Sequence, residues 1–376
     1  MKDAPAVRSP GMRFRRAALC RWNLFPLLLA TCSRPGRETK VPVPEPPPGI
    51  GAGEAAGLLS RLADDSLRGR MTGMPGSDKA AAMIASEMRR AGLRPVGDSG
   101  YFQRVPLVLR AMPSGRVLPT LAPGFAGLDS VPAGRRRIGV NVLGILPGVD
   151  STLDGEYVLV DAHLDHLGAA GDPLGFCRPV GADSICNGAD DDASGVVAVL
   201  LIARELAGEK RPRRSVLFAV MTGEEVGLLG SRWFIEHPPR PLASMAANLE
   251  IEMIGRPDSL AGGAGRAWLT GYQRSTMGEM LAAAGIPITA DPRPAEEFFE
   301  RSDNIEFARR GIVAHTLSSF NLHADYHRPG DEASRVDIAH MTAVIRAAAR
   351  AVRLLADGPK PEWKPGGKPE VRGRGR

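Results

Sequence analysis

Apolar residues follow two alternating spacings along this chain and predict alternating helices and strands. Apolar positions three and four residues apart predict helices, and short, mostly apolar runs predict strands. The predicted strands are 137–146, 157–162, 215–221, 248–254, 267–270 and 312–316, and the predicted helices are 52–64, 77–91, 193–207, 226–235, 273–284, 303–309 and 334–355. Such alternation is typical of an α/β three-layer sandwich, in which helices flank a mixed, mostly parallel central sheet.

The two ends of the chain differ in charge from its middle. Residues 1–40 contain 9 Lys and Arg against 2 Asp and Glu, and residues 359–376 contain 6 against 2. The whole chain has a formal charge of +6, so residues 41–358 have a net charge of −5. A mildly acidic body between basic ends does not favour nucleic-acid binding, and we expect no such partner.

Composition also divides the chain into segments. The 43% hydrophobic content can supply one sizeable core, which we assign to a domain over residues 50–358. Residues 33–49 are rich in proline and predict an extended tether. Residues 359–376 are rich in Pro, Gly, Lys and Arg, and we expect a disordered tail there.

The first 32 residues have the features of an export signal. Arg13, Arg15, Arg16 and Arg21 precede an apolar segment, 24–30, that is too short to span a bilayer. The string Leu-Ala-Thr-Cys that ends at Cys32 resembles a bacterial lipobox. We therefore expect export to the bacterial cell envelope or beyond, with membrane contact only through a lipid on Cys32. A lipoprotein and a cleaved soluble form both stay open, and the pattern does not indicate an oligomeric state.

Two of the four cysteines, Cys177 and Cys186, lie within the predicted domain. They are nine residues apart in a segment rich in Gly, Pro and Asp. Export exposes a protein to oxidising conditions, which favours a disulfide between them. A zinc site would need a second pair of cysteines, which the domain lacks.

Candidate metal ligands follow two predicted strands and open one predicted helix. His163 and Asp165 follow one strand, Glu224 and Glu225 follow another, and Asp191 lies in the acidic run before the helix at 193. Ligands of α/β sheets bind beyond the carboxyl ends of the strands. Histidine and carboxylate bind divalent metals such as zinc, and adjacent glutamates can supply one ligand and one base. This region therefore predicts a two-metal hydrolase.

Five motifs in order resemble the co-catalytic zinc aminopeptidase family, which also includes the glutamate carboxypeptidases. They are His163-x-Asp165, Asn187-Gly-Ala-Asp-Asp-Asp-Ala-Ser-Gly195, Glu224-Glu225, Glu252-Met-Ile-Gly255 and Tyr326-His327-x-x-x-Asp331. The resemblance covers about residues 58–355. It implies the zinc aminopeptidase-like sandwich and two Zn²⁺ ions.

The resemblance implies a role for each motif residue. One zinc ion would be held by His163, Asp191 and Glu252, and the other by Asp191, Glu225 and His327. Glu224 would be the general base and Tyr326 a donor to the oxyanion. The Asp165 carboxylate would accept a hydrogen bond from the His163 ring. The family also leads us to expect a cis peptide bond between Asp191 and Asp192.

Some positions depart from the family pattern. Glu252 replaces the more usual Asp, and Glu250 is a rival because it shares a strand face with Glu252. Asn304 stands where relatives often have His. His315 and His323 are weaker candidates and fit structural roles as well.

The resemblance implies an exported zinc aminopeptidase that hydrolyses the N-terminal peptide bond of a peptide substrate with a metal-bridged hydroxide. Alternatives are a carboxypeptidase or dipeptidase of the same family and a single-zinc glutaminyl cyclase. A lipid-anchored binding ectodomain without catalysis is a further alternative. A carboxypeptidase should have a basic residue at its pocket rim, and the sequence does not place Arg256, Arg293 or Arg301.

Overall fold

The computed structural model describes residues 49–208 and 210–370. The export signal predicted for residues 1–32, the lipobox at Cys32 and the tether up to residue 48 lie outside these ranges. None of the helices in the described ranges has both the length and the apolar character needed to span a bilayer.

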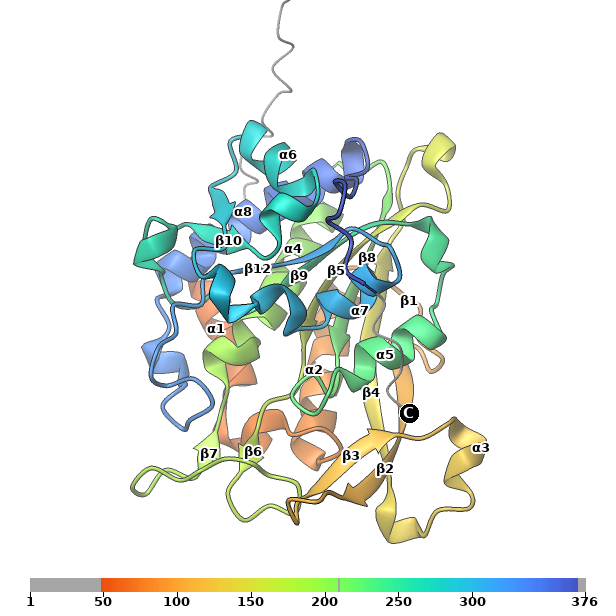
Figure 1. Cartoon of the computed structure of the whole chain (residues 1–376), viewed down its shortest axis with the longest axis vertical. Coiled ribbons are helices and arrows are strands. Elements are labelled where there is room, and N and C mark those ends of the chain that lie inside the picture. The colour runs from red at the N-terminus through yellow and green to blue at the C-terminus, as the bar shows by residue number, and fades with distance from the viewer. Residues whose placement is uncertain (1–48, 209, 371–376) are drawn as a thin grey trace, which may run out of the picture. The chain divides into compact units, whose positions relative to one another are not determined.

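A ten-stranded mixed sheet forms the middle layer (Figure 1). Its order is β11-β10-β12-β9-β5-β8-β4-β2-β3, and β1 also pairs with β4. Strands β12, β9, β5 and β8 are parallel neighbours, and β10 and β11 are also parallel to each other. The pairings of β10 with β12, β8 with β4, β4 with β2, and β2 with β3 are antiparallel. The bounds are β1 (Arg94–Pro95), β2 (Phe102–Ala111), β3 (Val117–Leu121), β4 (Arg136–Leu146), β5 (Tyr157–His163), β8 (Ser215–Met221), β9 (Met245–Ile251), β10 (Ala267–Leu269), β11 (Ile288–Ala290) and β12 (Ala314–Ser318).

Helices cover both faces of the sheet and confirm the predicted α/β sandwich. Val158 and Val160 face one apolar core, and Tyr157 and Leu159 face the other, because successive strand residues point to opposite faces. The first core contains residues of α1 (Ala52–Leu62), α2 (Pro75–Arg90), α4 (Gly195–Gly208), α6 (Met277–Ala283) and α8 (Ile338–Asp357). The second contains residues of α5 (Leu229–Glu236) and α7 (Asn304–Arg309). A short helix, α3 (Phe125–Leu128), follows β3.

The hairpin of β2 and β3 did not stand out in the sequence pattern. Its strands contain Arg104, Pro106 and Pro119, and several of their residues are exposed. β3 is an edge strand, where proline is tolerated because one side of the strand has no partner. A weak apolar alternation interrupted by proline gives little local signal for a strand.

The disordered tail predicted for residues 359–376 is wrong for residues 359–370. The Trp363 indole packs against both apolar cores, and its Nε1 donates to the main-chain oxygen of Gly311 at 3.0 Å. Main-chain hydrogen bonds join Glu362 and Lys364 to the segment around Arg274. The composition suggested disorder, but one tryptophan supplies enough apolar surface to anchor the segment.

The predicted disulfide between Cys177 and Cys186 is confirmed. It closes the loop between β6 (Gly168–Ala169) and β7 (Ile185–Cys186), a small two-stranded sheet. This segment of the chain, residues 170–186, is called the disulfide loop below.

Replacing both Cys177 and Cys186 with serine should lower the free energy of unfolding by about 2–3 kcal/mol, because the reduced chain gains loop entropy when unfolded. Urea denaturation of the variant and the oxidised wild type measures this difference. Equal denaturation midpoints would show that the bond does not stabilise the fold.

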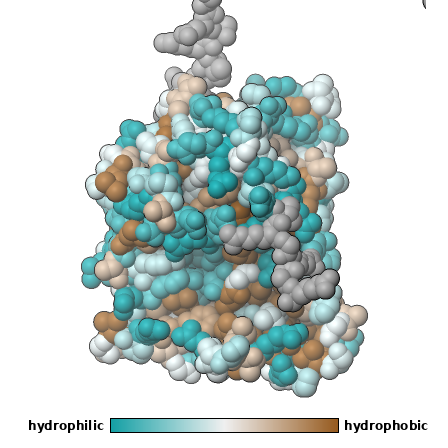
Figure 2. Space-filling view, viewed as in Figure 1, coloured by the Kyte–Doolittle hydropathy of each residue, from teal (hydrophilic) through white to brown (hydrophobic). Residues whose placement is uncertain are grey.

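Hydrophilic side chains cover most of the face seen in Figure 2, with apolar side chains between them. The most exposed large apolar residues lie on separate segments: Val149, Val180, Leu260 and Leu322. Scattered apolar residues are normal on a protein surface and indicate no docking face.

Candidate functional site

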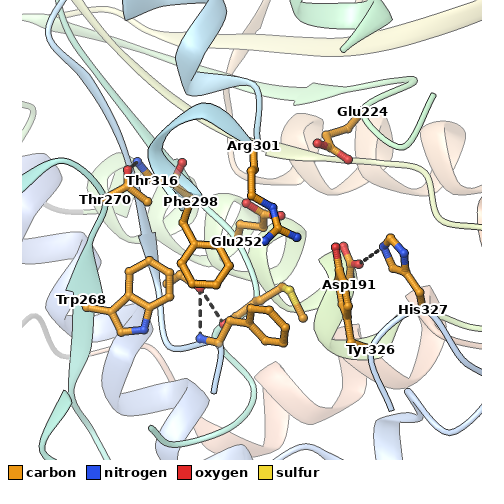
Figure 3. Close-up of a pocket in the computed structure, with 13 residues that line it drawn as sticks. Asp191, Glu224, Glu252, Trp268, Thr270, Phe298, Arg301, Thr316, Tyr326 and His327 are labelled. Carbon is orange, nitrogen blue, oxygen red and sulfur yellow. Dashed lines mark hydrogen bonds and ion pairs between the residues drawn. The ribbon is translucent and has the colours of Figure 1, made fainter. Parts of the chain in front are cut away.

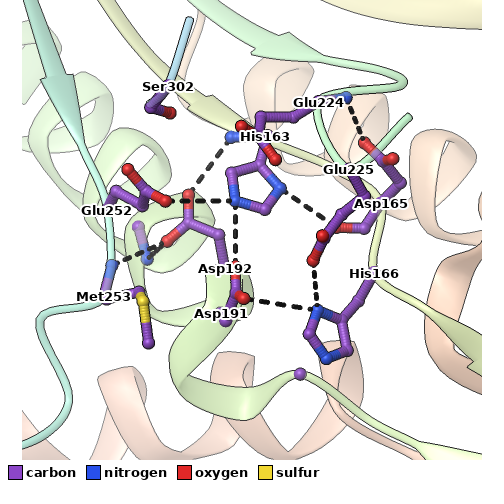
Figure 4. Close-up of polar contacts among 12 residues, drawn as sticks. His163, Asp165, His166, Asp191, Asp192, Glu224, Glu225, Glu252, Met253 and Ser302 are labelled. Carbon is purple, nitrogen blue, oxygen red and sulfur yellow. Dashed lines mark hydrogen bonds and ion pairs between the residues drawn. The ribbon is translucent and has the colours of Figure 1, made fainter. Parts of the chain in front are cut away.

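The carboxyl ends of three adjacent parallel strands, β9, β5 and β8, bring candidate residues together. His163 is the last residue of β5 and lies opposite Met221, the last residue of β8. Glu224 and Glu225 follow β8, and Glu252 follows β9, which ends at Ile251 rather than at the predicted residue 254. Parallel pairing therefore places these carboxylates on both sides of the His163 ring (Figure 4).

Asp191 enters the site from a kinked turn, η4 (Ala189–Ser194), that precedes α4 and in which the backbone of Asp191 and Asp192 is not helical. The cis peptide bond expected between Asp191 and Asp192 is present. The Asp331 carboxylate accepts hydrogen bonds from the main-chain amides of Asp190 and Asp191, at 3.0 Å each. Asp331 therefore positions the backbone of this turn.

The two acidic neighbours of Asp191 accept main-chain hydrogen bonds. Asp192 accepts from the amides of His163 and Met253, both at 3.1 Å. Asp190 accepts from the amide of Gly255 at 2.6 Å. These bonds tie the turn to the ends of β5 and β9. The Asp191 carboxylate takes no part in them and faces His163 and His327.

Asp191 directs its two oxygens toward two different groups of side chains. Oδ1 lies 3.0 Å from His163 Nε2, which lies 3.8 Å from Glu252 Oε1. Oδ2 lies 3.2 Å from His327 Nε2, which is also 3.2 Å from Glu225 Oε2. Figure 3 shows the contact between Asp191 and His327. One carboxylate thus belongs to two candidate ligand sets.

These distances and groups fit zinc. Two ligands at about 2.0–2.1 Å from a tetrahedral zinc ion lie about 3.3 Å apart, close to the separations of the two sets. His163 Nε2 is buried and faces the carboxylates of Asp191 and Glu252 without a well-formed hydrogen bond to either. Within the described ranges no Lys or Arg forms an ion pair with Asp191, Glu225 or Glu252. A divalent cation would neutralise this concentration of acidic groups.

The hydrogen bond predicted between the Asp165 carboxylate and His163 is wrong. His163 Nδ1 instead lies 3.0 Å from the main-chain oxygen of Asp165. The Asp165 carboxylate accepts from the amides of Gly223 and Glu224, at 2.7 and 3.1 Å. The turn after β8 leaves these two amides without sheet partners, and the carboxylate satisfies both. Asp165 therefore positions the two glutamates.

The Glu224 side chain lines a pocket beside the site and belongs to neither ligand set. Removal from water raises the pKa of its carboxyl well above the usual range, and the charges of Glu225 and Glu252 add to that rise, while His163 opposes it. A carboxylate with a raised pKa is a better proton acceptor.

His166 also lies at the site, although the sequence patterns did not single it out. Its Nδ1 is 2.7 Å from Glu225 Oε1 and 3.6 Å from Asp191 Oδ2. Its ring stands edge-on to the His327 ring, with centroids 5.6 Å apart. A second histidine three residues after His163 was the available signal.

Glu250, the rival of Glu252, serves the structure elsewhere. Its carboxylate accepts from Ser302 Oγ at 2.6 Å, Asn304 N at 2.9 Å and Thr316 Oγ1 at 2.7 Å. Burial raises its pKa to about 7. The geometry therefore favours Glu252 as the candidate ligand.

The two weaker histidine candidates lie outside the ligand sets. His315 is buried between Ser275 Oγ and the main-chain oxygen of Thr270, and burial lowers its pKa to about 4. His323 Nε2 lies 3.1 Å from Asp190 Oδ2. Both contacts are typical of structural histidines.

A pocket lies beside Glu224 and Glu252, and its lining combines aromatic walls with the hydroxyl side chains of Thr270, Thr316 and Ser318 (Figure 3). Trp268, Phe298 and Phe320 form these walls, and Arg301 lies over the Phe298 ring at 5.0 Å from its centroid. Arg256 and Arg293 pair instead with aspartates. Among the three arginines that the sequence could not place, Arg301 is therefore the one that lines this pocket.

Tyr326 lines the same pocket and stacks on His327, with ring centroids 3.8 Å apart. Removal from water raises the pKa of its phenol, and the charges of Asp191 and Glu225 raise it further. The phenol therefore keeps its proton at neutral pH and can donate a hydrogen bond.

Comparison with known proteins gives matches over this part of the chain. Peptidase family M28 matches residues 141–352, which include both candidate ligand sets. A vacuolar membrane protease of Sclerotinia sclerotiorum is 27% identical over 206 residues, 53% of this chain and 16% of the relative. Leucine aminopeptidase 2 of Trichophyton rubrum is 27% identical over 193 residues, 45% of this chain and 39% of the relative. The chain thus spans well under half of these relatives' length.

The fold is shared with solved structures. A zinc aminopeptidase from Bacillus subtilis superposes with a TM-score of 0.59 at 17% identity, covering 82% of this chain and 96% of that chain. This likeness agrees with the sandwich described above.

Proposed function

Because the chain belongs to peptidase family M28, we propose that it is a zinc-dependent exopeptidase that removes the N-terminal residue of peptides. The division of the two Asp191 oxygens between two ligand sets carries this proposal. His163, Asp191 and Glu252 would hold one zinc ion, and Asp191, Glu225 and His327 the other.

Zinc held there would lower the pKa of water and polarise the substrate carbonyl. Glu224 would accept a proton from the attacking water and return it to the leaving amine. The Tyr326 phenol would donate a hydrogen bond to the carbonyl oxygen as negative charge develops on it. Asp165 would hold the turn that carries Glu224 through the two amide hydrogen bonds.

The pocket supports an aminopeptidase. Its aromatic walls suit an apolar side chain, and the carboxylates of Glu224 and Glu252 at its edge suit a free α-amine. Arg301 in the same pocket supports a second candidate, a carboxypeptidase or dipeptidase of the family, because a guanidinium suits a free carboxylate.

The two remaining alternatives have less support. A glutaminyl cyclase would need a single zinc ion, whereas two ligand sets share Asp191 here. A binding ectodomain without catalysis would have no use for Glu224 beside a complete set of ligands.

We also propose that the protein is exported, either as a lipoprotein anchored through Cys32 or as a cleaved soluble form. The order of arginines, apolar segment and lipobox supports export. The bond between Cys177 and Cys186 supports an oxidising compartment.

A peptide panel tests the proposed activity. Zinc-loaded protein should hydrolyse peptides with a free N-terminus and should not hydrolyse their N-acetylated forms. The hydrolysis should stop when a chelator removes the metal. Mass spectrometry of the products identifies the bond that is cleaved.

Other outcomes of the panel would point to the alternatives. Cleavage of N-acetylated peptides that have a free C-terminus would support the carboxypeptidase. Pyroglutamate formation from an N-terminal glutamine, with one zinc ion per chain, would support the cyclase. Failure to act on any member would support the binding ectodomain.

A further inference from the structure

A second cavity borders the site next to Glu225 and His327. Glu225, Tyr326 and His327 line the part that adjoins the site, and Leu118, Leu167 and Phe176 also line the cavity. Three arginines, Arg116, Arg178 and Arg328, complete the lining and are called the arginine rim below. The cavity shares Tyr326 and His327 with the aromatic pocket, so both open onto the same centre.

The arginine rim is assembled from three segments that are distant in the sequence. Arg116 directly precedes β3, Arg178 follows Cys177 in the disulfide loop, and Arg328 follows His327. The disulfide holds this loop, and Arg68 donates two hydrogen bonds to Asp172 within it, at 2.6 and 3.1 Å. The fold, rather than one local sequence, therefore brings the three guanidinium groups around one cavity.

The three guanidinium groups are available to a ligand. All three side chains are exposed, and in the ranges 49–208 and 210–370 none of them forms an ion pair with a carboxylate. Arg116 lies over the Phe176 ring, 5.2 Å from its centroid, which orients the side chain and leaves its N–H groups free. Arginines elsewhere, such as Arg256 and Arg293, are paired with aspartates.

The concentration of positive charge is unusual beside such an acidic centre. Among the described residues that line this cavity, Glu225 is the only acidic one, and it belongs to a candidate ligand set whose charge a metal would offset. A substrate carboxylate in this cavity would therefore lie among three guanidinium groups. Carboxylates pair best with guanidinium, because two N–H groups can bind two oxygens.

We propose that the arginine rim binds a carboxylate of the peptide substrate on the Glu225 and His327 side of the centre. This inference rests on the proposed peptidase function and adds a preference for acidic substrates to it. The carboxylate can come from the free C-terminus of a short peptide or from an acidic side chain.

Matched peptide pairs distinguish the two sources. Leu-Gly against Leu-Gly-amide tests the terminal carboxylate, and Leu-Glu-amide against Leu-Gln-amide tests the side chain. The wild type should prefer the carboxylate member of at least one pair by about tenfold in kcat/KM, as expected for charge-assisted pairing. The preference should fall as salt rises from low to molar concentration, because the rim is exposed.

The variant combining Arg116→Gln, Arg178→Gln and Arg328→Gln should lose this preference and bring the ratio of the two kcat/KM values close to one. Arg178→Gln alone, in which His327 keeps its natural neighbour, should lower the same ratio by a smaller factor. Arg211→Gln is the matched control. It removes one exposed guanidinium from the segment before β8, at the end of the strand away from the site, and should keep the wild-type ratio.

A wild-type ratio near one for both pairs would overturn the inference, and so would a triple variant that keeps the wild-type preference. Both results leave hydrolysis of the amidated peptides intact and so leave the proposed function standing. If zinc-loaded wild type hydrolyses none of the four peptides, the proposed function fails and this inference fails with it.

Discussion

Glu224→Gln should lower kcat by about 10²–10⁴-fold, the usual contribution of a general acid–base group, while the zinc content stays at the wild-type value. Glutamine keeps the size of the side chain but cannot take up a proton. The Glu224 side chain lies outside both ligand sets, and its main-chain amide is bound to Asp165 whatever the side chain is. Steady-state kinetics on a cleaved peptide and metal analysis of the same sample measure both quantities.

Glu225→Gln is the matched control for this prediction. Its carboxylate lies 3.2 Å from His327 Nε2 and 2.7 Å from His166 Nδ1, inside a ligand set. This variant should lose zinc as well as activity. If Glu224→Gln lost zinc and Glu225→Gln kept it, the roles of the two glutamates would be exchanged.

Asp191→Asn should remove zinc from both ligand sets. An amide has one oxygen acceptor, and its NH₂ group cannot bind a cation, so one of the two sets loses its shared ligand and the other loses a negative charge. The loss of zinc affinity should exceed the loss of about 10–100-fold that is typical when a residue that only orients a ligand is replaced. Competition titration with a chromophoric chelator measures both sites.

His163→Gln and His327→Gln are the controls for the shared role of Asp191. Each histidine belongs to one set, so each variant should lose one zinc ion and keep the other. The circular dichroism spectrum of each variant is compared with that of metal-free wild type, which shows whether the fold is retained. A folded Asp191→Asn variant that still binds two ions would show that this carboxylate is not shared.

Zinc bound to the folded chain should also stabilise it. A ligand at about 1,000 times its Kd adds about 4 kcal/mol to the free energy of unfolding. Asp191→Asn should therefore show little change in thermal midpoint on addition of zinc, whereas the wild-type midpoint should rise.

The fold was predictable where the apolar pattern is strong. Strand β8 was predicted with its observed bounds, and β5 within one residue, because both are apolar throughout. The β2–β3 hairpin and the packing of Trp363 were not predicted. Prolines weaken the strand signal in the hairpin, and a single aromatic residue leaves no periodic pattern in the tail.

The sequence by itself determined which residues could form the site. Through their resemblance to the zinc aminopeptidase family, the ordered motifs pointed to His163, Asp191, Glu224, Glu225, Glu252, Tyr326 and His327. Residue type and motif order can be read without a structure, and local spacing shows which of these residues follow a strand or open a helix.

Only the tertiary structure decided how those residues face one another. It turned the Asp165 carboxylate toward two amides, separated Glu250 from Glu252, and brought His166 and the arginine rim to the site. Side-chain direction beyond a strand end depends on which unpaired groups lie nearby. Contacts between distant segments depend on how the whole chain packs, and local sequence carries little information about either.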